Sequence, residues 1–303
     1  MSIRSFLFTS VVIGLFATVL SAIPHLPAHT WVSGANGNDT NPGTRALPFA
    51  TFQAAVNGTA AGGLVSVADP GDFGPFTINK AITIDGGGVG GSLTIPGAGN
   101  TGIGIYAGAS DTVILRHLTI DGIGQGGTPI YFSTGGMLLV EDCVLEGFTS
   151  AGIDVLSYGS QNVVVKNTTI TGGFAGFNVN PGTGPVQASL QGVTISNASY
   201  AAVDVGNGVT TISNSVITQS PIGLDATNGS TINAESNIFS YNTTAVWAAP
   251  TGTIRLSNSD IFNNGTGIGA GGGTVATTGN NRKAGNPGTG APVGTPNATI
   301  GVQ

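Results

Sequence analysis

Residues 163–179 read VVVKNTTITGGFAGFNV, and this stretch contains the unit from which the fold is built. Apolar and other side chains alternate over residues 163–166, as in a strand with one buried face. A second short strand ends at Ile170, and a glycine-containing turn leads to a third strand around Asn178. No helix-length segment separates these strands, so the stretch is not a βαβ unit.

The same pattern recurs along the chain in steps of 25 and then 22 residues. The apolar residue that closes the second strand recurs at Ile120, Leu145, Ile170, Ile195, Ile217, Phe239 and Ile261. A second apolar series keeps the same steps at Leu115, Val140, Val165, Leu190, Ile212, Ala234 and Leu256. Two series in step predict three-stranded coils stacked at about 4.8 Å, which is an all-β parallel β-helix, or solenoid.

The composition agrees with such a fold and excludes several others. Glycine supplies 51 of 303 residues, charged residues make up 7%, and 40% of residues are hydrophobic. These values exclude a helical bundle, charge-driven disorder and, because the glycines are not periodic, collagen. A net charge of −6 with eight Lys and Arg excludes nucleic-acid binding. The single cysteine, Cys143, excludes an internal disulfide and is expected to be a small buried hydrophobe.

The first residues are typical of an export signal. Arg4 is followed by an apolar stretch over residues 6–20, and small residues offer cleavage sites after Ala22 or Ala28. The stretch is short for a bilayer span, so we expect an exported protein, secreted, periplasmic or on the cell surface, with no transmembrane span after cleavage. The predicted organisation is 1–22 signal peptide, 23–62 N-terminal segment and cap, 63–284 parallel β-helix and 285–303 flexible Gly/Pro-rich tail.

The N-terminal segment contains a stretch with helical spacing. Phe49, Phe52 and Val56 can share one helix face, and a β-helix must cover the open edges at its ends. We therefore expect a short capping helix here.

Two columns of mostly polar residues lie at the end of the first strand of each coil, one at the last strand residue and one at the residue after it. The residue after the strand is expected to point inward and form a partial side-chain ladder, in which His117 is a core histidine with its hydrogen bonds satisfied. This column is His117, Asp142, Asn167, Gly192, Asn214, Ser236 and Asn258. The preceding residue faces outward, and the alternating signs of Arg116, Glu141 and Lys166 predict surface ion pairs between coils.

Several segments resemble a group of exported bacterial right-handed β-helix proteins related to the pectin-lyase-like superfamily. They are residues 30–34 (TWVSG), 41–42 (NP), 50–55 (ATFQAA), 69–74 (DPGDFG), 82–86 (ITIDG) and 279–282 (GNNR). The resemblance covers roughly residues 30–285 and implies a right-handed, single-stranded helix. Most members of this group have no assigned activity. Many carry two cysteines near residues 41–42, where this chain has Gly43 and Phe49, so no cap disulfide is expected.

Enzymes of this superfamily act on polysaccharides along one outward strand face. The matching column here is Gly104, Tyr131, Asp154, Asn178, Asp204, Asp225, Trp247 and Gly269. Aromatic rings stack on sugars and carboxylates accept hydroxyl hydrogen bonds, so the six residues from Tyr131 to Trp247 are the candidate ligand-binding set. The residues two positions earlier are small and are expected to leave the outer surface open. They are Gly152, Gly176, Ala202, Gly223, Ala245 and Gly267, together with Thr128, which stands three positions before Tyr131.

If the chain is an enzyme, the candidate catalytic residues are Asp154, Asp204 and Asp225. Coil counting separates Asp204 from Asp225 by about 4.8 Å and from Asp154 by about 9.6 Å. Both retaining and inverting glycoside hydrolysis are therefore open. The column has no Lys or Arg to act as a lyase base, and the motifs of polygalacturonases, pectate lyases and mannuronan epimerases are missing.

These observations favour an exported scaffold or adhesion protein that contacts a polysaccharide or cell-surface glycan, over an enzyme. The alternative is a polysaccharide-degrading enzyme, either a glycoside hydrolase or a pectate-lyase-like protein. No cofactor is predicted, and calcium is expected only under the lyase alternative. A third class, a structural trimer of the phage-tail or adhesin kind, stays open because the sequence does not give the oligomeric state.

Overall fold

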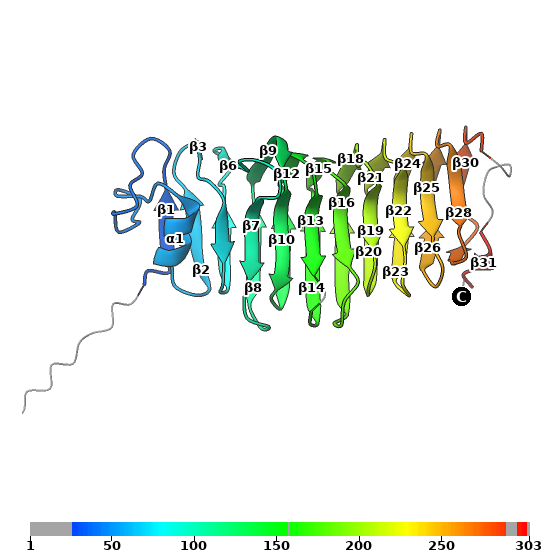
Figure 1. The fold of residues 1–303 in the computed structure, drawn as a ribbon, viewed down its shortest axis with the longest axis horizontal. Helices are drawn as coiled ribbons and strands as arrows, with labels where there is room; N and C mark the ends of the chain where they lie inside the picture. Colours follow the sequence, from blue (N-terminus) through cyan, green and yellow to red (C-terminus); the bar gives the residue numbers. More distant parts are fainter. Residues whose placement is uncertain (1–25, 157, 289–295, 302–303) are drawn as a thin grey trace, which may run out of the picture.

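Each coil contributes one short strand to each of three parallel sheets that run along the molecule (Figure 1). The computed structural model describes residues 26–156, 158–288 and 296–301, and the predicted signal peptide, residues 1–22, lies outside them. The architecture is the predicted all-β, right-handed parallel β-helix. Among the described residues, no helix is long and apolar enough to cross a membrane.

The three sheets are named A, B and C in the order in which a coil visits them. Sheet A contains β1 (His29–Val32), β2 (Gly63–Val67), β5 (Ile82–Asp85), β8 (Thr112–Arg116), β11 (Met137–Glu141), β14 (Gln161–Lys166), β17 (Val186–Gln191), β20 (Val209–Ser213), β23 (Thr231–Glu235), β26 (Thr253–Ser257), β29 (Thr274–Thr277) and β31 (Ala298–Thr299). Sheet B contains β3 (Gly71–Asp72), β6 (Gly91–Thr94), β9 (Leu118–Gly126), β12 (Val144–Phe148), β15 (Thr169–Gly172), β18 (Thr194–Ser196), β21 (Val216–Thr218), β24 (Ile238–Ser240), β27 (Asp260–Phe262) and β30 (Arg282–Ala284). Sheet C contains β4 (Phe76–Ile78), β7 (Thr101–Tyr106), β10 (Thr128–Thr134), β13 (Ala151–Leu156), β16 (Ala175–Asn180), β19 (Ala201–Val205), β22 (Ile222–Ala226), β25 (Thr244–Ala248) and β28 (Thr266–Ala270).

The core is the stack of inward side chains that the two apolar series predicted. Every member of both series is at most 2% exposed. Neighbouring members are also register partners, as Leu145 is with Ile120 and with Ile170. The fixed step along the sequence therefore reflects a fixed register between strands. Each inward residue covers the one in the coil before it, which removes both from water.

The predicted capping helix is α1 (Phe52–Gly58), which contacts β1, β2 and β4 at the N-terminal end (Figure 1). Thr51 caps it by accepting a hydrogen bond from the Ala54 N–H. Phe52 is fully buried, with its ring 4.9 Å from that of Phe73 and 5.1 Å from that of Phe76. The Gln53 side chain accepts from the Thr77 N–H and donates to the Thr77 carbonyl, so it satisfies part of the β4 edge that no further strand covers.

The C-terminal end is covered in a related way. β31 lies within the segment predicted as a tail, residues 285–303, and it pairs with β29 as the last strand of sheet A. The Asn297 side chain accepts from the Val275 N–H and donates to the Gly273 carbonyl. This part of the predicted tail therefore belongs to the β-helix end.

The predicted inward ladder is wrong by one residue. All seven members of that column, from His117 to Asn258, have positive φ angles between 45° and 64°. In this left-handed conformation the side chain turns out of the coil, and the following residue faces the interior instead. His117 is accordingly not a core histidine, because its side chain is 41% exposed. The buried position belongs to residues such as Cys143, Ser215 and Asn237.

A buried asparagine ladder lies at the other turn, between sheets B and C. The Asn242 amide donates to Asn264 Oδ1 at 3.0 Å, and the Asn264 amide donates to Asn286 Oδ1 at 3.1 Å. All three side chains are buried, and the oxygens of Asn264 and Asn286 also accept backbone N–H groups of the preceding coil. The ladder thus joins successive coils at a corner that would otherwise leave polar backbone groups unsatisfied.

Cys143 occupies the position that the sequence predicted. It is 1% exposed, and burial raises the pKa of its thiol to about 12. The thiol donates weak hydrogen bonds to the carbonyls of Leu115 and Glu141, so it behaves as a small core side chain.

Candidate functional site

The six candidate ligand-binding residues form one row across sheet C. Each residue is the register partner of the next on the neighbouring strand. The row, which we call the sheet-C row, is Tyr131 on β10, Asp154 on β13, Asn178 on β16, Asp204 on β19, Asp225 on β22 and Trp247 on β25. Residues separated by more than one hundred positions in the sequence are therefore placed along one face by strand stacking alone.

One end of the row is a pair of tyrosines. The ring of Tyr131 lies 6.1 Å from that of Tyr106, which is 49% exposed at the end of β7. Burial raises the pKa of the Tyr131 phenol, and the neighbouring Tyr106 and Asp154 add to the rise. Sequence reasoning named Tyr131 alone. Tyr106 could have been found, since it stands two residues after Gly104, the member of the predicted column on β7.

The carboxylate of Asp154 is held by two side-chain amides. Asn178 donates to its Oδ1 at 2.7 Å and Asn180 donates to the same atom at 2.6 Å. Burial raises the pKa of Asp154, and the two amide hydrogen bonds oppose that rise. Asn180 was not among the predicted residues, although its place two residues beyond Asn178 on β16 puts it on the same outward face.

Asp204 and Asp225 form a carboxyl pair with two different environments. Burial, together with the charge of Asp225, raises the pKa of Asp204 to about 6. Asp225 is only 1% exposed, and its Oδ2 accepts a 2.6 Å hydrogen bond from the Tyr200 hydroxyl. Its Oδ1 has no hydrogen-bond partner among the described residues. Burial raises the pKa of Asp225 despite the Tyr200 hydrogen bond, which lowers it.

Tyr200 extends the site into the turn before β19. Its ring stacks on Phe174, with centroids 4.9 Å apart and planes 10° from parallel, and Phe174 is 51% exposed. The hydrogen bond to Asp225 raises the pKa of the Tyr200 phenol. Sequence reasoning missed both rings, because a turn residue does not belong to a strand column.

Trp247 closes the other end of the row and is 36% exposed. Its indole lies against Gly269 and Gly271 of the next coil, where a β-carbon on either glycine would collide with the ring. The two glycines therefore provide the surface on which the tryptophan rests, and part of the indole stays in contact with solvent.

The expectation that small residues open the surface beside the row is wrong. The first three residues of β10, β13, β16 and β19 are all buried, as Ala201, Ala202 and Val203 are on β19. Gly176 faces inward, where a β-carbon would meet the side chain of Ile195. Because the strand bends at the corner with sheet B, these residues leave the alternating pattern. Their small size lets coils pack at the corner.

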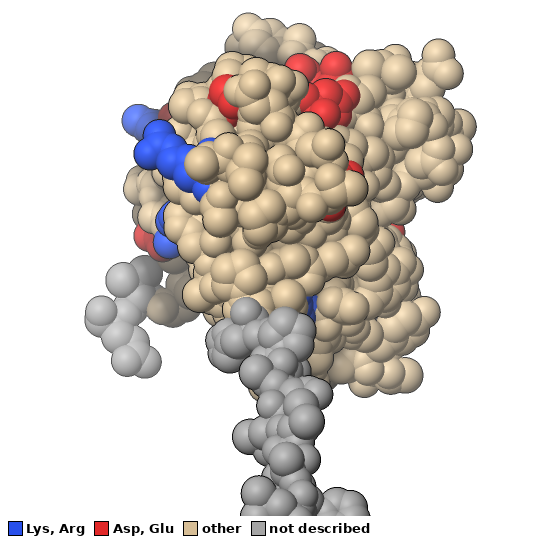
Figure 2. Space-filling model, turned by 90° about the vertical axis from the view of Figure 1, so that its left-hand side faces the viewer, with Lys and Arg blue, Asp and Glu red and all other residues tan. Residues whose placement is uncertain are grey.

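The face carries carboxylates without compensating cations. The nine strands of sheet C contain three aspartates and neither Lys nor Arg. Viewed from the N-terminal end, most of the surface is uncharged, and the Lys and Arg side chains gather toward one edge (Figure 2). Within the described ranges, no group of three or more His, Cys, Asp or Glu side chains could hold a metal ion.

This geometry separates the roles open to the three aspartates. Glycoside hydrolysis requires two carboxyl groups that both reach the sugar. Asp154 and Asp204 are both partly exposed, although Asp154 is held by two amides, whereas Asp225 is buried and bound to Tyr200. The arrangement can present rings and hydrogen-bond acceptors along a line, but only one member of the adjacent Asp204–Asp225 pair is exposed, and one oxygen of Asp154 is already bound by two amides.

Comparisons with known proteins agree on the fold. Residues 175–297 match a family model described as a right-handed beta helix region. The crystal structure of pectate lyase Pel9A is similar, with a TM-score of 0.50 and 14% sequence identity, over 87% of this chain and 81% of that one. No curated protein sequence matches the chain. The likeness shows a right-handed β-helix of the pectate-lyase type and leaves the activity to be argued from the site.

Proposed function

We propose that this protein is an exported β-helix scaffold that binds a neutral or amino-sugar-containing polysaccharide along the sheet-C row without cleaving it. The observation that carries the proposal is the unbroken register from Tyr131 to Trp247, with an aromatic ring at each end and hydrogen-bonding side chains between them. Export rests on the apolar stretch and small residues of positions 1–22.

The length of the row suits a chain of sugars. Five strand steps separate Tyr131 from Trp247, which corresponds to about 24 Å at the usual strand spacing. An extended polysaccharide lying across the strands would place a terminal sugar on each aromatic end. Between them, Asp204 accepts hydroxyl hydrogen bonds and Asn178 also offers its amide group.

The charge of the face favours some polysaccharides over others. Three aspartates with no Lys or Arg on the strands of sheet C create a negative potential. Polymers of uronic acids would be repelled, whereas neutral chains are accepted and protonated amino sugars are attracted. The proposed ligand class therefore excludes the polyuronates on which a pectate lyase acts.

The absence of cleavage in this proposal rests on the two carboxyl groups that could assist Asp204, which are Asp154 and Asp225. Asp154 already accepts the amides of Asn178 and Asn180 on one oxygen. A second carboxyl group would have to act as nucleophile or base on the sugar or on a water molecule. Asp225 is 1% exposed and already accepts the Tyr200 hydroxyl, so it serves the structure of the row rather than a reaction.

One observation favours a second candidate, a glycoside hydrolase. The pKa of Asp204 is about 6, which suits a general acid near neutral pH. Under this candidate Asp204 protonates the leaving oxygen, and Asp225 must become exposed when the sugar binds.

A panel of neutral, amino-sugar and uronic-acid polysaccharides separates the two candidates. We expect binding to the first two classes, loss of at least tenfold in affinity on Trp247→Ala, and no new reducing ends after long incubation. Tyr241→Ala is the matched control, because Tyr241 is 65% exposed and lies outside sheet C. Binding that survives Trp247→Ala overturns the proposed face, and reducing ends that disappear in Asp204→Asn establish the hydrolase.

A further inference from the structure

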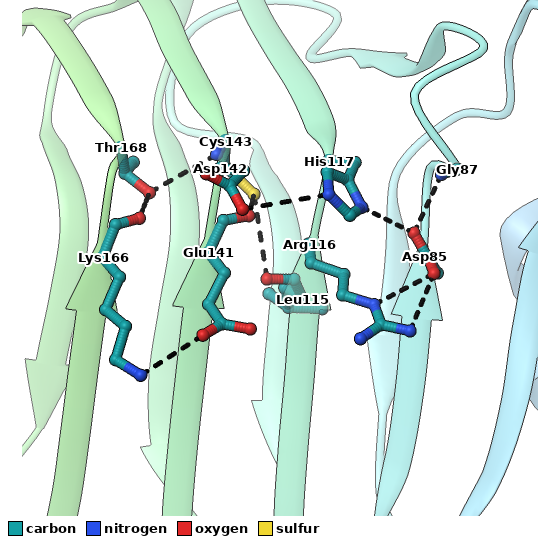
Figure 3. Close-up of polar contacts among 10 residues, drawn as sticks. All are labelled: Asp85, Gly87, Leu115, Arg116, His117, Glu141, Asp142, Cys143, Lys166 and Thr168. Atoms are coloured by element: carbon teal, nitrogen blue, oxygen red, sulfur yellow. Dashed lines mark hydrogen bonds and ion pairs between the residues drawn. The ribbon is translucent and has the colours of Figure 1, made fainter.

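The outer face of sheet A carries a charged row that the glycan site does not use. Asp85, Arg116, Glu141 and Lys166 are register partners on the consecutive strands β5, β8, β11 and β14. Their charges alternate along the helix as minus, plus, minus, plus. Arg116 pairs with Asp85 at 2.9 Å and Lys166 pairs with Glu141 at 3.4 Å (Figure 3). Both cationic side chains keep about two-fifths of their surface exposed, at 38% and 42%.

A second row lies two residues earlier on the same strands and is largely apolar. Its central members, Ile114, Leu139 and Val164, are register partners on β8, β11 and β14. They point outward, because the residues on either side of each are fully or almost fully buried. All three remain partly exposed on a face where solvated side chains would be expected.

The row of charges is complementary to a second copy of itself laid in the opposite direction, because minus, plus, minus, plus then faces plus, minus, plus, minus. A two-fold axis that lies parallel to the strands, between β8 and β11, keeps the strand direction and reverses the order of the coils. It therefore brings Arg116 opposite Glu141 of a second copy and Asp85 opposite Lys166 of that copy. The same operation places Ile114 against Leu139 of the second copy, so the apolar row is buried at the centre.

Other symmetric arrangements lack this match. An axis placed on β11 sets Glu141 against itself and Arg116 against Lys166, which opposes like charges. An axis along the helix and over the apolar row reverses the strand direction. It sets Arg116, Glu141 and Lys166 against uncharged residues, which are Thr112, Met137 and Asn162. Only the axis between β8 and β11 gives all four charged residues an opposite partner.

We propose that sheet A is a self-association surface on which two copies of this chain pack face to face about that axis. The contact is isologous, with the same patch on both subunits. The six strands from β2 to β17 cover about 29 Å by about 16 Å, which places the contact near the lower size limit of specific interfaces. The dimer is therefore weak and concentration-dependent. Because the glycan row lies on sheet C, each dimer displays two rows and gains avidity for a long polymer.

Mass in solution, measured by sedimentation over a range of concentrations, tests the surface. The protein should shift from the monomer mass toward twice that value as its concentration rises. Leu139→Lys should hold it at the monomer mass. Arg255→Glu on β26 is the matched control, since it reverses a charge on the same sheet outside the patch. A monomer at every concentration up to the solubility limit overturns the proposal.

Complementary charge reversals test the axis itself. Arg116→Glu and Glu141→Arg each create two like-charge contacts, so each variant alone should be monomeric. An equimolar mixture should recover the dimer, because the introduced glutamate of one variant then faces the introduced arginine of the other, while the remaining wild-type pair is restored. Circular dichroism establishes that each variant is folded. If one is not, the outer pair of reversals, Asp85→Lys and Lys166→Asp, takes the place of both in the same mixing experiment. The arrangement is overturned if the folded mixture does not recover the dimer. It is also overturned if each variant alone still forms dimers.

Discussion

Asp204 and Asp225 are register partners on β19 and β22, and burial raises the pKa of both carboxyl groups. Among the residues that the structure describes, neither carboxyl group forms an ion pair, and the strands of sheet C contain no Lys or Arg. The folded protein therefore holds protons on this pair more tightly than the unfolded chain does. This difference links the stability of the fold to the pH at which the sheet-C row works.

Replacement of Asp204 by asparagine should remove much of that linkage. The folded pKa of about 6 exceeds the unfolded value of about 3.9. The stabilisation from this group is therefore complete below about pH 4 and is lost as the pH rises through 6. We expect the free energy of unfolding of Asp204→Asn to be higher than that of the wild type by about 2 kcal/mol at pH 7.5 and by little at pH 4. Urea unfolding at both pH values measures this. Glu235→Gln on the exposed side of sheet A is the control, and an equal gain at both pH values would contradict the prediction.

The buried asparagine ladder makes a second prediction. Asn264 donates to the Phe239 carbonyl and to Asn286, and it accepts from the backbone and side chain of Asn242. Its replacement by alanine leaves several buried polar groups without partners, each at a cost of about 1–3 kcal/mol. We expect Asn264→Ala to lower the free energy of unfolding by at least about 3 kcal/mol. Asn57→Ala on the exposed side of α1 should change it by less than about 0.5 kcal/mol. Similar small losses in both would show that the ladder does not stabilise the coils.

The N-terminal cap should decide whether the chain stays in solution. Phe52 is fully buried between Phe73 and Phe76, and it anchors α1 against β4. Phe52→Ala should lower the free energy of unfolding by about 3–5 kcal/mol and expose the β4 edge to other chains. Light scattering during storage should rise together with the loss of stability. Leu47→Ala, at a residue that is 53% exposed, is the control. A destabilised but non-aggregating Phe52→Ala variant would assign edge protection to another element.

The parts of the structure that could be predicted are those that strand stacking fixes. The steps of 25 and 22 residues determine which residues share a row, so the core series and the row through Asp154 and Asp204 follow from counting. Positions at turns do not follow in this way. His117 turns outward because its φ is positive, and Gly176 turns inward at a bend, yet both sit at regular intervals in the sequence. A regular interval fixes the row of a residue, whereas the local backbone angle fixes the direction of its side chain.

Tyr200 shows the remaining limit and makes the last prediction. Its hydroxyl reaches one coil ahead to Asp225, 25 residues away, and no periodic pattern marks that contact. Tyr200→Phe keeps the ring on Phe174 but leaves the buried Asp225 carboxylate without a described hydrogen bond. The pKa of Asp225 should then rise further, because the hydrogen bond that lowers it is gone.

The free energy of unfolding that Tyr200→Phe removes should therefore be larger at high pH than at low pH. Above the folded pKa of Asp225 the unpaired charge is buried, so Tyr200→Phe should lower the free energy of unfolding by about 2 kcal/mol at pH 7.5. Because the pKa of Asp225 is raised, a larger fraction of its carboxyl group is protonated at pH 4 than at pH 7.5, and the loss should be smaller at pH 4. In an Asp225→Asn background the effect should be small at both pH values, and Tyr241→Phe serves as the exposed control. A loss of equal size at pH 4 and pH 7.5 would mean that the hydroxyl supports packing in the turn and does not stabilise the carboxylate.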